Sequence, residues 1–184
     1  MEIETSFETK EGRLNQYVGL TVLLFSVVMA LGKIKDDNIV QAMQQEKVQS
    51  VDVWNEYQAK RLKRHLQQNS AEIIEALDPS GRNAERIKTL RDDVDRYEAE
   101  SKDLAAKAKA LDDQYDLQSY RDDQFDLADA MLSIAIALAG ITALTRKRWM
   151  MITSWVFGLG GIAFTTAGFA EWALHPDAII RWLT

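Results

Sequence analysis

The 184-residue chain contains no cysteine, only two histidines and only two prolines. The absence of cysteine excludes disulfides, thiolate metal sites and thiol nucleophiles, although it does not decide the compartment. His65 and His175 each lack a second histidine nearby in a ligand pattern, so no metal site is predicted. No nucleophile elbow, catalytic-triad order or cofactor fingerprint is present, and the sequence therefore predicts a non-enzymatic protein without a cofactor.

Basic residues are in deficit, because 22 lysines and arginines stand against 28 acidic residues and leave a net charge of −6. Phosphate neutralisation needs a clustered basic surface, so this balance argues against nucleic-acid binding. The N-terminal segment is acidic and lacks a small-residue cleavage site, so we expect no removable signal peptide. The first apolar segment should therefore be retained.

Charge is nearly absent from three long segments: YVGLTVLLFSVVMAL, LADAMLSIAIALAGITAL and WMMITSWVFGLGGIAFTTAGFA. Each is close to the roughly 20 apolar residues that cross a bilayer core about 30 Å thick. The sequence therefore predicts an all-α membrane protein, in contact with membrane lipid, with transmembrane helices at 17–32, 127–145 and 149–174.

Shorter segments flank these helices at both ends. An N-terminal tail, 1–16, precedes the first helix. After the third, Pro176 can open a short helix, so 175–184 is predicted to lie along the membrane interface.

The polar segment 33–126 is predicted to form a long antiparallel coiled-coil hairpin. Pro79 and Gly81 mark a chain reversal in the turn DPSGRN, 78–83. After the turn, apolar or small residues recur at alternating steps of three and four, a pattern typical of a coiled coil. They are Ile87, Leu90, Val94, Tyr97, Ser101, Leu104, Ala108, Leu111 and Tyr115, and the same steps continue through Asp122, Phe125 and Asp129.

The helix before the turn is less regular. Its apolar residues Val40, Val51, Leu62 and Ile73 recur every eleven residues. This period is compatible with a nearly straight helix.

The two sides of the hairpin have a predictable register. If 17–32 pairs with 127–142 in antiparallel orientation, the midpoint of the chain between them falls in the Pro79–Ser80 turn. The turn itself was located independently, from its proline and glycine. In this register Lys47 lies opposite Asp112 and Asp113, and the basic run 60–65 lies opposite Asp95, Glu98 and Glu100. Much of the charge is therefore expected to be matched internally.

The tight turn between the second and third segments is basic, because Arg146, Lys147 and Arg148 are consecutive there. Total counts of basic residues tie between the two sides, but this local density favours the cytoplasmic side under the positive-inside rule. The N-terminus is therefore predicted to be cytoplasmic and the hairpin to lie on the opposite side.

Carboxylates crowd the start of the second apolar segment, in YRDDQFDLADAM. Asp122, Asp126 and Asp129 share one helix face. In an oligomer with that face inward, rings of carboxylates would attract cations at a pore mouth. The alternative is a solvated helix end that faces Lys33 and Lys35, although Asp129 lies inside the apolar run, where a carboxylate is a functional hypothesis by default.

Small residues follow helical spacing on the last two segments. The third carries Ser154, Gly158, Gly161, Thr165 and Gly168, and the second carries Ala130, Ser133, Ala137 and Gly140. Such faces predict close helix packing within the protomer or between copies. The run GLGGIAFTTAG is not a phosphate loop, because no strand precedes it and no Lys-Ser/Thr ending follows.

The densest run of distinctive side chains in the hairpin is VWNEYQAKRLKRH. It offers a candidate docking surface for a partner or a neighbouring copy, formed by Trp54, Tyr57, Lys60, Arg61 and Arg64. In the alternative interpretation, the aromatic rings pack between the two hairpin helices and the basic residues pair with the second helix.

Several stretches together resemble the bacterial membrane family called domain of unknown function 4337. They are DVWNEYQAKRLKRHL, QFDLADAMLSIAIALAGITALTRKRW and the small-residue third segment. The resemblance extends from about Tyr17 to Phe169, and its most specific parts are WNxYQAK and LTRKRW. It implies a bacterial inner-membrane protein, so the hairpin would lie in the periplasm, but it implies no catalytic residue.

These features predict a homo-oligomeric inner-membrane protein that acts as a structural scaffold or interaction platform through its stalk. A lone hairpin gives each helix only one partner, and the small-residue faces invite further contacts. An oligomeric ion channel with an acidic mouth is the alternative. An accessory subunit of a larger membrane complex is a further alternative.

Overall fold

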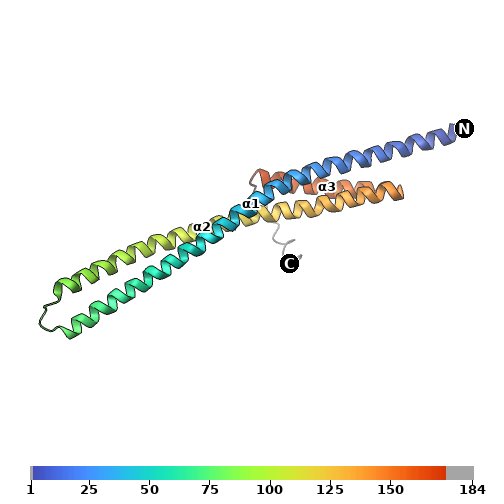
Figure 1. Ribbon diagram of the computed structural model, residues 1–184. Coiled ribbons are helices and arrows are strands. Elements are labelled where there is room, and N and C mark those ends of the chain that lie inside the picture. The colour runs from blue at the N-terminus through green and yellow to red at the C-terminus, as the bar shows by residue number, and fades with distance from the viewer. Residues whose placement is uncertain (1, 173–184) are drawn as a thin grey trace. The chain divides into compact units, whose positions relative to one another are not determined.

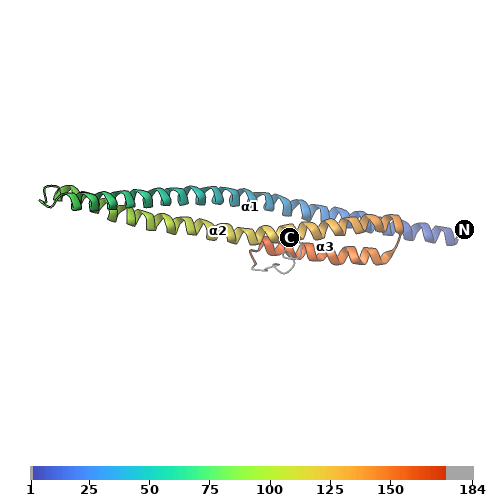
Figure 2. The same cartoon turned by 90° about the horizontal axis from the view of Figure 1, so that it is seen from below.

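Three α-helices make up the described part of the chain, in the order α1 (Glu2–Leu77), α2 (Ala84–Thr145) and α3 (Arg148–Phe169). The computed structural model describes the backbone of residues 2–172 and the side chains of residues 12–172, and it contains no strand within those limits. The predicted interfacial segment 175–184, with His175, lies outside the described residues. Figures 1 and 2 show the helices from two directions.

Each helix is long and apolar enough to cross a membrane, as expected for a multi-pass membrane protein. The helix α1 includes the predicted tail from Glu2 onward, so tail and apolar segment form one continuous helix. The helix α3 ends at Phe169, within the predicted range 149–174. Beyond it, Glu171 has a positive φ of 57°, and the Trp172 N–H donates to the Ala167 carbonyl at 3.1 Å. This left-handed ending of the Schellman type stops the helix.

The chain divides into two units. The three-helix unit comprises Met1–Ala42 and Leu117–Thr184, and the two-helix unit comprises Met43–Asp116. All of the predicted transmembrane segments belong to the three-helix unit. The predicted turn 78–83 belongs to the two-helix unit.

In the two-helix unit, α1 and α2 lie side by side and are joined at residues 78–83 (Figures 1 and 2). The Asp78 carboxylate accepts hydrogen bonds from the Ser80 hydroxyl and from the Asn83 N–H, the latter at 2.6 Å. These contacts, chiefly the one from Ser80, hold the pKa of Asp78 below its ordinary value. Gly81 has φ +71°, which few residues other than glycine adopt readily.

On α2, the predicted row of residues spaced by three and four positions lies toward α1. Every residue of that row from Ile87 to Tyr115 is buried or half-buried. The eleven-residue row on α1 lies elsewhere, because Val51, Leu62 and Ile73 are exposed and Val40 is half-buried in the three-helix unit. The buried or half-buried row of α1 is instead more polar: Met43, Glu46, Ser50, Val53, Tyr57, Lys60, Arg64, Gln67, Ala71 and Ile74.

Ion pairs connect the two helices in the predicted register. Lys60 pairs with Glu100 at 2.5 Å, Arg64 with Glu98 at 3.7 Å, and Lys47 with Asp112 at 3.8 Å. All three pairs remain partly accessible to solvent, and ion pairs of this kind contribute only about 0–1 kcal/mol each. They fix the alignment of the helices more than they stabilise it.

The core of the three-helix unit forms where α3 packs against α1 and α2. The largest side chains in it are Phe25 of α1 and Leu132 of α2, both almost fully buried. A Cβ atom at Gly158 would overlap the Phe25 ring, and one at Gly161 would lie 2.6 Å from Leu132 Cγ. The Ser154 hydroxyl donates to the Ala135 carbonyl at 2.7 Å. Close approach of the backbones therefore depends on small residues of α3.

The two small-residue stripes have different environments. All five stripe residues of α3 are buried within the protomer: Ser154, Gly158, Gly161, Thr165 and Gly168. The stripe of α2 is exposed along its length: Ala130, Ser133, Ala137 and Gly140. A Cβ at Gly140 would have no neighbour within 4 Å. Within the protomer, the stripe of α3 therefore packs against other helices, whereas the stripe of α2 is not covered.

This difference predicts opposite effects for two matched substitutions. Gly158→Ala forces the Phe25 ring to move, and overpacking of this kind costs about 1–3 kcal/mol. Gly140→Ala meets no neighbouring atom and raises helix propensity. Thermal unfolding in detergent, followed by circular dichroism, should show a lower midpoint for Gly158→Ala and an unchanged or higher one for Gly140→Ala. Equal midpoints would contradict this account of the core.

Candidate functional site

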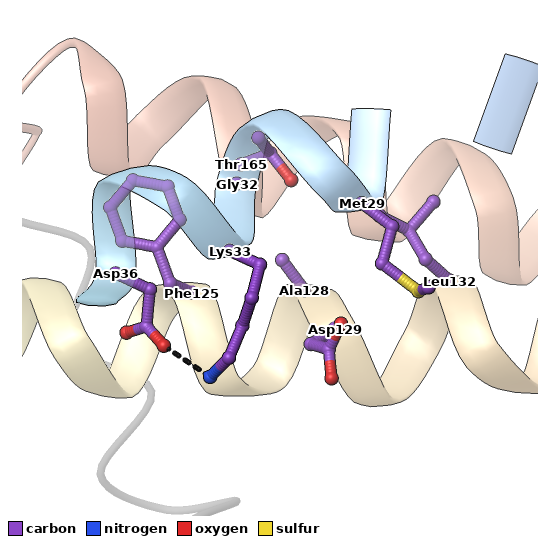
Figure 3. Close-up of a pocket in the computed structure, with 9 residues that line it drawn as sticks. All are labelled: Met29, Gly32, Lys33, Asp36, Phe125, Ala128, Asp129, Leu132 and Thr165. Atoms are coloured by element: carbon purple, nitrogen blue, oxygen red, sulfur yellow. Dashed lines mark hydrogen bonds and ion pairs between the residues drawn. The ribbon is translucent and has the colours of Figure 1, made fainter. Parts of the chain in front are cut away.

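A small cavity of about 10 Å³ lies among the three helices, about the space that one water molecule needs. Polar side chains reach it from all three helices: Lys33 and Asp36 from α1, Asp129 from α2 and Thr165 from α3. Figure 3 shows Lys33 and Asp36 extending from α1 toward α2. Their neighbours are apolar or small: Met29, Gly32, Phe125, Ala128 and Leu132.

Asp36 is the most deeply buried carboxylate in this region, with 3% of its surface exposed. Its Oδ2 accepts a hydrogen bond from the Lys33 ammonium at 2.7 Å. That hydrogen bond is the main reason why the pKa of Lys33 is raised. The other oxygen, Oδ1, is buried and accepts no hydrogen bond from the described residues.

The half-buried carboxyl group of Asp122 interacts with the carboxyl group of Asp36. Ionised carboxylates only accept hydrogen bonds, so this contact becomes a hydrogen bond when the pair carries one proton. Loss of solvation, followed by the contact with Asp36, raises the pKa of Asp122 to about 7. The arrangement therefore suits a shared proton near neutral pH.

The other two predicted carboxylates have different surroundings. Asp126 is exposed, yet the helices around it exclude enough water, with help from the Asp36 charge, to raise its pKa. Asp129 is half-buried and lines the cavity. Among the described residues, no three acidic or histidine side chains converge in a way that could hold a metal ion. The predicted attraction of cations by these carboxylates stays a prediction.

The end of α3 is attached to α2 beside these carboxylates. Arg121 pairs with Glu171 at 3.2 Å, and the Gln124 side-chain amide donates to the Trp172 carbonyl at 2.9 Å. Gln124 is 1% exposed, so the side chain through which α2 holds this turn is itself buried. After the loss of solvation, the charged groups that raise the pKa of Asp122 are Asp36 on α1, and Asp126 and Asp123 on α2.

Asp36 is the residue of this site that the sequence prediction missed. The predicted register signalled it, because antiparallel pairing of 17–32 with 127–142 extends to bring position 36 opposite 122–123. Position 36 lies outside the apolar segment, and a carboxylate in a polar segment is not unusual. The register does not specify how deeply position 36 is buried, and in the folded unit only 3% of its surface is exposed.

The predicted docking residues lie in the two-helix unit and mostly contact one another or α2. The half-buried Trp54 indole donates to Asp112 at 3.2 Å, and its ring meets Tyr57 edge to face at 5.3 Å. Lys60 and Arg64 form the ion pairs described above. Arg61 is exposed and lies over the Tyr57 ring at 5.6 Å. These contacts agree with the alternative interpretation of internal packing and leave Arg61 most accessible to a partner.

The turn between α2 and α3 carries the residues used to predict orientation. Arg146, Lys147 and Arg148 are all exposed, and Arg146 has a positive φ of 58°. The chain therefore presents a compact basic surface at this end of the three-helix unit.

The raised pKa of Asp122 predicts that stability falls as pH rises. An unfolded aspartate loses its proton near 3.8, whereas folded Asp122 keeps it to about 7. The native state therefore binds more protons in this window, and the stabilisation present below it is lost as pH passes about 7. Asp112, Glu98 and Glu100 have lowered pKa values, so their contributions are lost only below their ordinary values of 3.8–4.5.

Thermal midpoints of the purified full-length protein, measured from about pH 5 to about pH 8, should show this fall. Asp122→Asn should flatten the profile and raise the midpoint at the upper end, because the neutral amide can donate to Asp36. Asp113→Asn, at an exposed position of the same helix, is the control and should follow the unsubstituted protein. A fall that persists unchanged in Asp122→Asn would assign it to other groups.

Comparison with known proteins identifies a family without identifying an activity. The family model described as Domain of unknown function (DUF4337) matches residues 14–171. No curated protein and no solved structure matches the chain. The matched region includes all of the carboxylates discussed above and both small-residue stripes. The chain therefore belongs to the Domain of unknown function (DUF4337) family.

Proposed function

We propose that the protein is a homo-oligomeric bacterial inner-membrane scaffold, inserted through its three apolar helices and assembled through its two-helix unit. The observation that carries this proposal is the apolar row on the outer face of α1. Within residues 43–116, every large apolar side chain that is exposed belongs to α1: Val48, Val51, Leu62, Leu66, Ile73 and Leu77. Exposed apolar rows of this kind mark interaction surfaces.

The geometry of the outer row fits a helix as its occupant. Val51, Leu62 and Ile73 repeat every eleven residues, as do Leu66 and Leu77, so the row runs almost straight along α1. At 1.5 Å per residue, the row from Val48 to Leu77 is about 45 Å long. Every copy of the chain presents the same row, so a second copy can cover it through a symmetric contact.

The inner face of the pair supports the same proposal. The face of α1 toward α2 includes Glu46, Lys60 and Arg64, so part of the contact between the helices is polar. The steps of three and four on both inner rows support a coiled-coil hairpin. Burial of the outer row by another copy would add about 1.5–3 kcal/mol for each large apolar side chain.

The proposal predicts that the triple variant Val51→Gln, Leu62→Gln and Ile73→Gln dissociates the oligomer. The three side chains are exposed in the protomer, so helix content should stay unchanged while the mass of the detergent-solubilised particle falls. The control replaces exposed alanines on the outer face of α2, as Ala99→Gln, Ala106→Gln and Ala110→Gln, and should leave the mass unchanged.

Three results of the mass measurement would overturn this assignment. A monomeric unsubstituted particle would exclude the oligomer. An oligomer that survives the triple variant would exclude the outer row as its contact. A stoichiometric foreign protein would favour the accessory-subunit alternative instead.

The proposed orientation puts the N-terminus in the cytoplasm and the two-helix unit in the periplasm. The basis is the exposed basic turn of Arg146, Lys147 and Arg148 and the positive-inside rule. Because the chain has no cysteine, a single introduced thiol reports its own side of the membrane. In intact cells with permeabilised outer membranes, an impermeant maleimide should label Ser80→Cys and spare Lys147→Cys. The reverse pattern would invert the orientation.

A further inference from the structure

A surface groove of the three-helix unit lies at the basic end of α3, apart from the acidic cavity. Its volume is about 660 Å³. One wall comes from α1 and the other from the first two turns of α3: Arg13, Leu14 and Tyr17, and Met151, Ile152 and Trp155 with Arg148. Two chain segments that are distant in sequence therefore form one groove.

The groove combines two cations with an apolar surface. Arg13 and Arg148 stand on opposite walls, and none of the side chains between residues 12 and 172 that line the groove is a carboxylate. Among side chains 12–172, neither arginine forms an ion pair. The remaining lining is aliphatic or aromatic, so the surface matches a ligand that joins an anionic group to a hydrocarbon chain.

The aromatic wall is fixed by the core. The Trp155 ring meets the buried Phe25 ring edge to face, with centroids 5.9 Å apart, and Phe25 fills the space left by Gly158. Trp155 is still 40% exposed, and Tyr17 on the facing helix is 63% exposed. Both rings therefore remain accessible to a ligand, and one of them is held in place.

We propose that this groove binds one anionic phospholipid, with its phosphate between Arg13 and Arg148 and an acyl chain along Tyr17 and Trp155. Guanidinium groups bind phosphate through paired, charge-assisted hydrogen bonds. Both segments stand at an end of an apolar helix, where a bilayer places its headgroups beside tyrosine and tryptophan. Basic pockets between transmembrane helices on the cytoplasmic side recognise anionic headgroups in this way. The proposal rests on the membrane insertion and orientation proposed above, and not on the oligomer.

Fluorescence of Trp155 tests the site. In a full-length variant with phenylalanine at the other four tryptophan positions, Trp155 is the only indole. Vesicles contain phosphatidylcholine mixed with phosphatidylglycerol, and bromine is carried on the acyl chains of one lipid or the other. Quenching should indicate a preference of roughly 25-fold for brominated phosphatidylglycerol, because each of the two arginines near the surface contributes about fivefold.

The double variant Arg13→Gln and Arg148→Gln should reduce the preference to about one. Lys147→Gln removes a neighbouring charge that does not line the groove, and it should leave the preference intact. Equal quenching by both lipids would overturn the lipid site while leaving insertion in place. Absence of quenching by either lipid would overturn insertion as well. Loss of the preference in Lys147→Gln alone would assign the preference to general surface charge.

A second measurement needs no tryptophan replacement. Native mass spectrometry of the detergent-solubilised protein should show retained phosphatidylglycerol, which the double arginine variant loses and Lys147→Gln keeps. Added inorganic phosphate should not displace it, because the acyl chain shares in binding. Displacement by phosphate alone would reassign the groove to a free anion, and retention in the double variant would exclude the arginines as ligands.

Discussion

The three-helix unit depends on the close approach of α3 to its two neighbours, which is possible only because α3 has no bulky side chain on one face. Phe25 occupies the space at Gly158, and Leu132 occupies the space at Gly161. Protein interiors are packed so densely that even one added methyl group must displace a neighbour. The same contact holds Trp155 against Phe25, so the small residues also shape the groove on the other side of α3.

Close packing changes the chemistry of the acidic residues beside it. Asp36 and Asp122 lie where the helices exclude water, and the Lys33 ammonium engages only one of the two Asp36 oxygens. In the two-helix unit the same functional group behaves in the opposite way, because Asp112 receives hydrogen bonds from Ser50 and Trp54 that lower its pKa. Solvation and the available hydrogen-bond donors, rather than residue type, therefore set the pKa of each carboxylate.

Much of this arrangement could be predicted from the sequence because helical periodicity is a local property. The predicted row on α2 is buried or half-buried throughout, and the predicted register matches the observed ion pairs of Lys47, Lys60 and Arg64. Spacing also identified both small-residue stripes, but it could not decide which of them another helix covers. That choice depends on where α3 packs, and α3 covers its own stripe while leaving that of α2 exposed. Asp36 lies outside the apolar segments, so periodicity alone could not reveal its burial.

In the two-helix unit, the polarity of α1 is the reverse of what its apolar periodicity predicts. Apolar periodicity normally marks the face that a helix buries, yet Leu62 and Ile73 face outward while Lys60 and Arg64 face α2. Polar inner contacts specify alignment, because a shift of one turn would separate each charge from its partner and leave half-buried groups unmatched. They contribute little net stability. In α1 the charged side chains that pair with α2 therefore lie on the inner face, and the exposed apolar side chains on which the proposed association rests lie on the outer face.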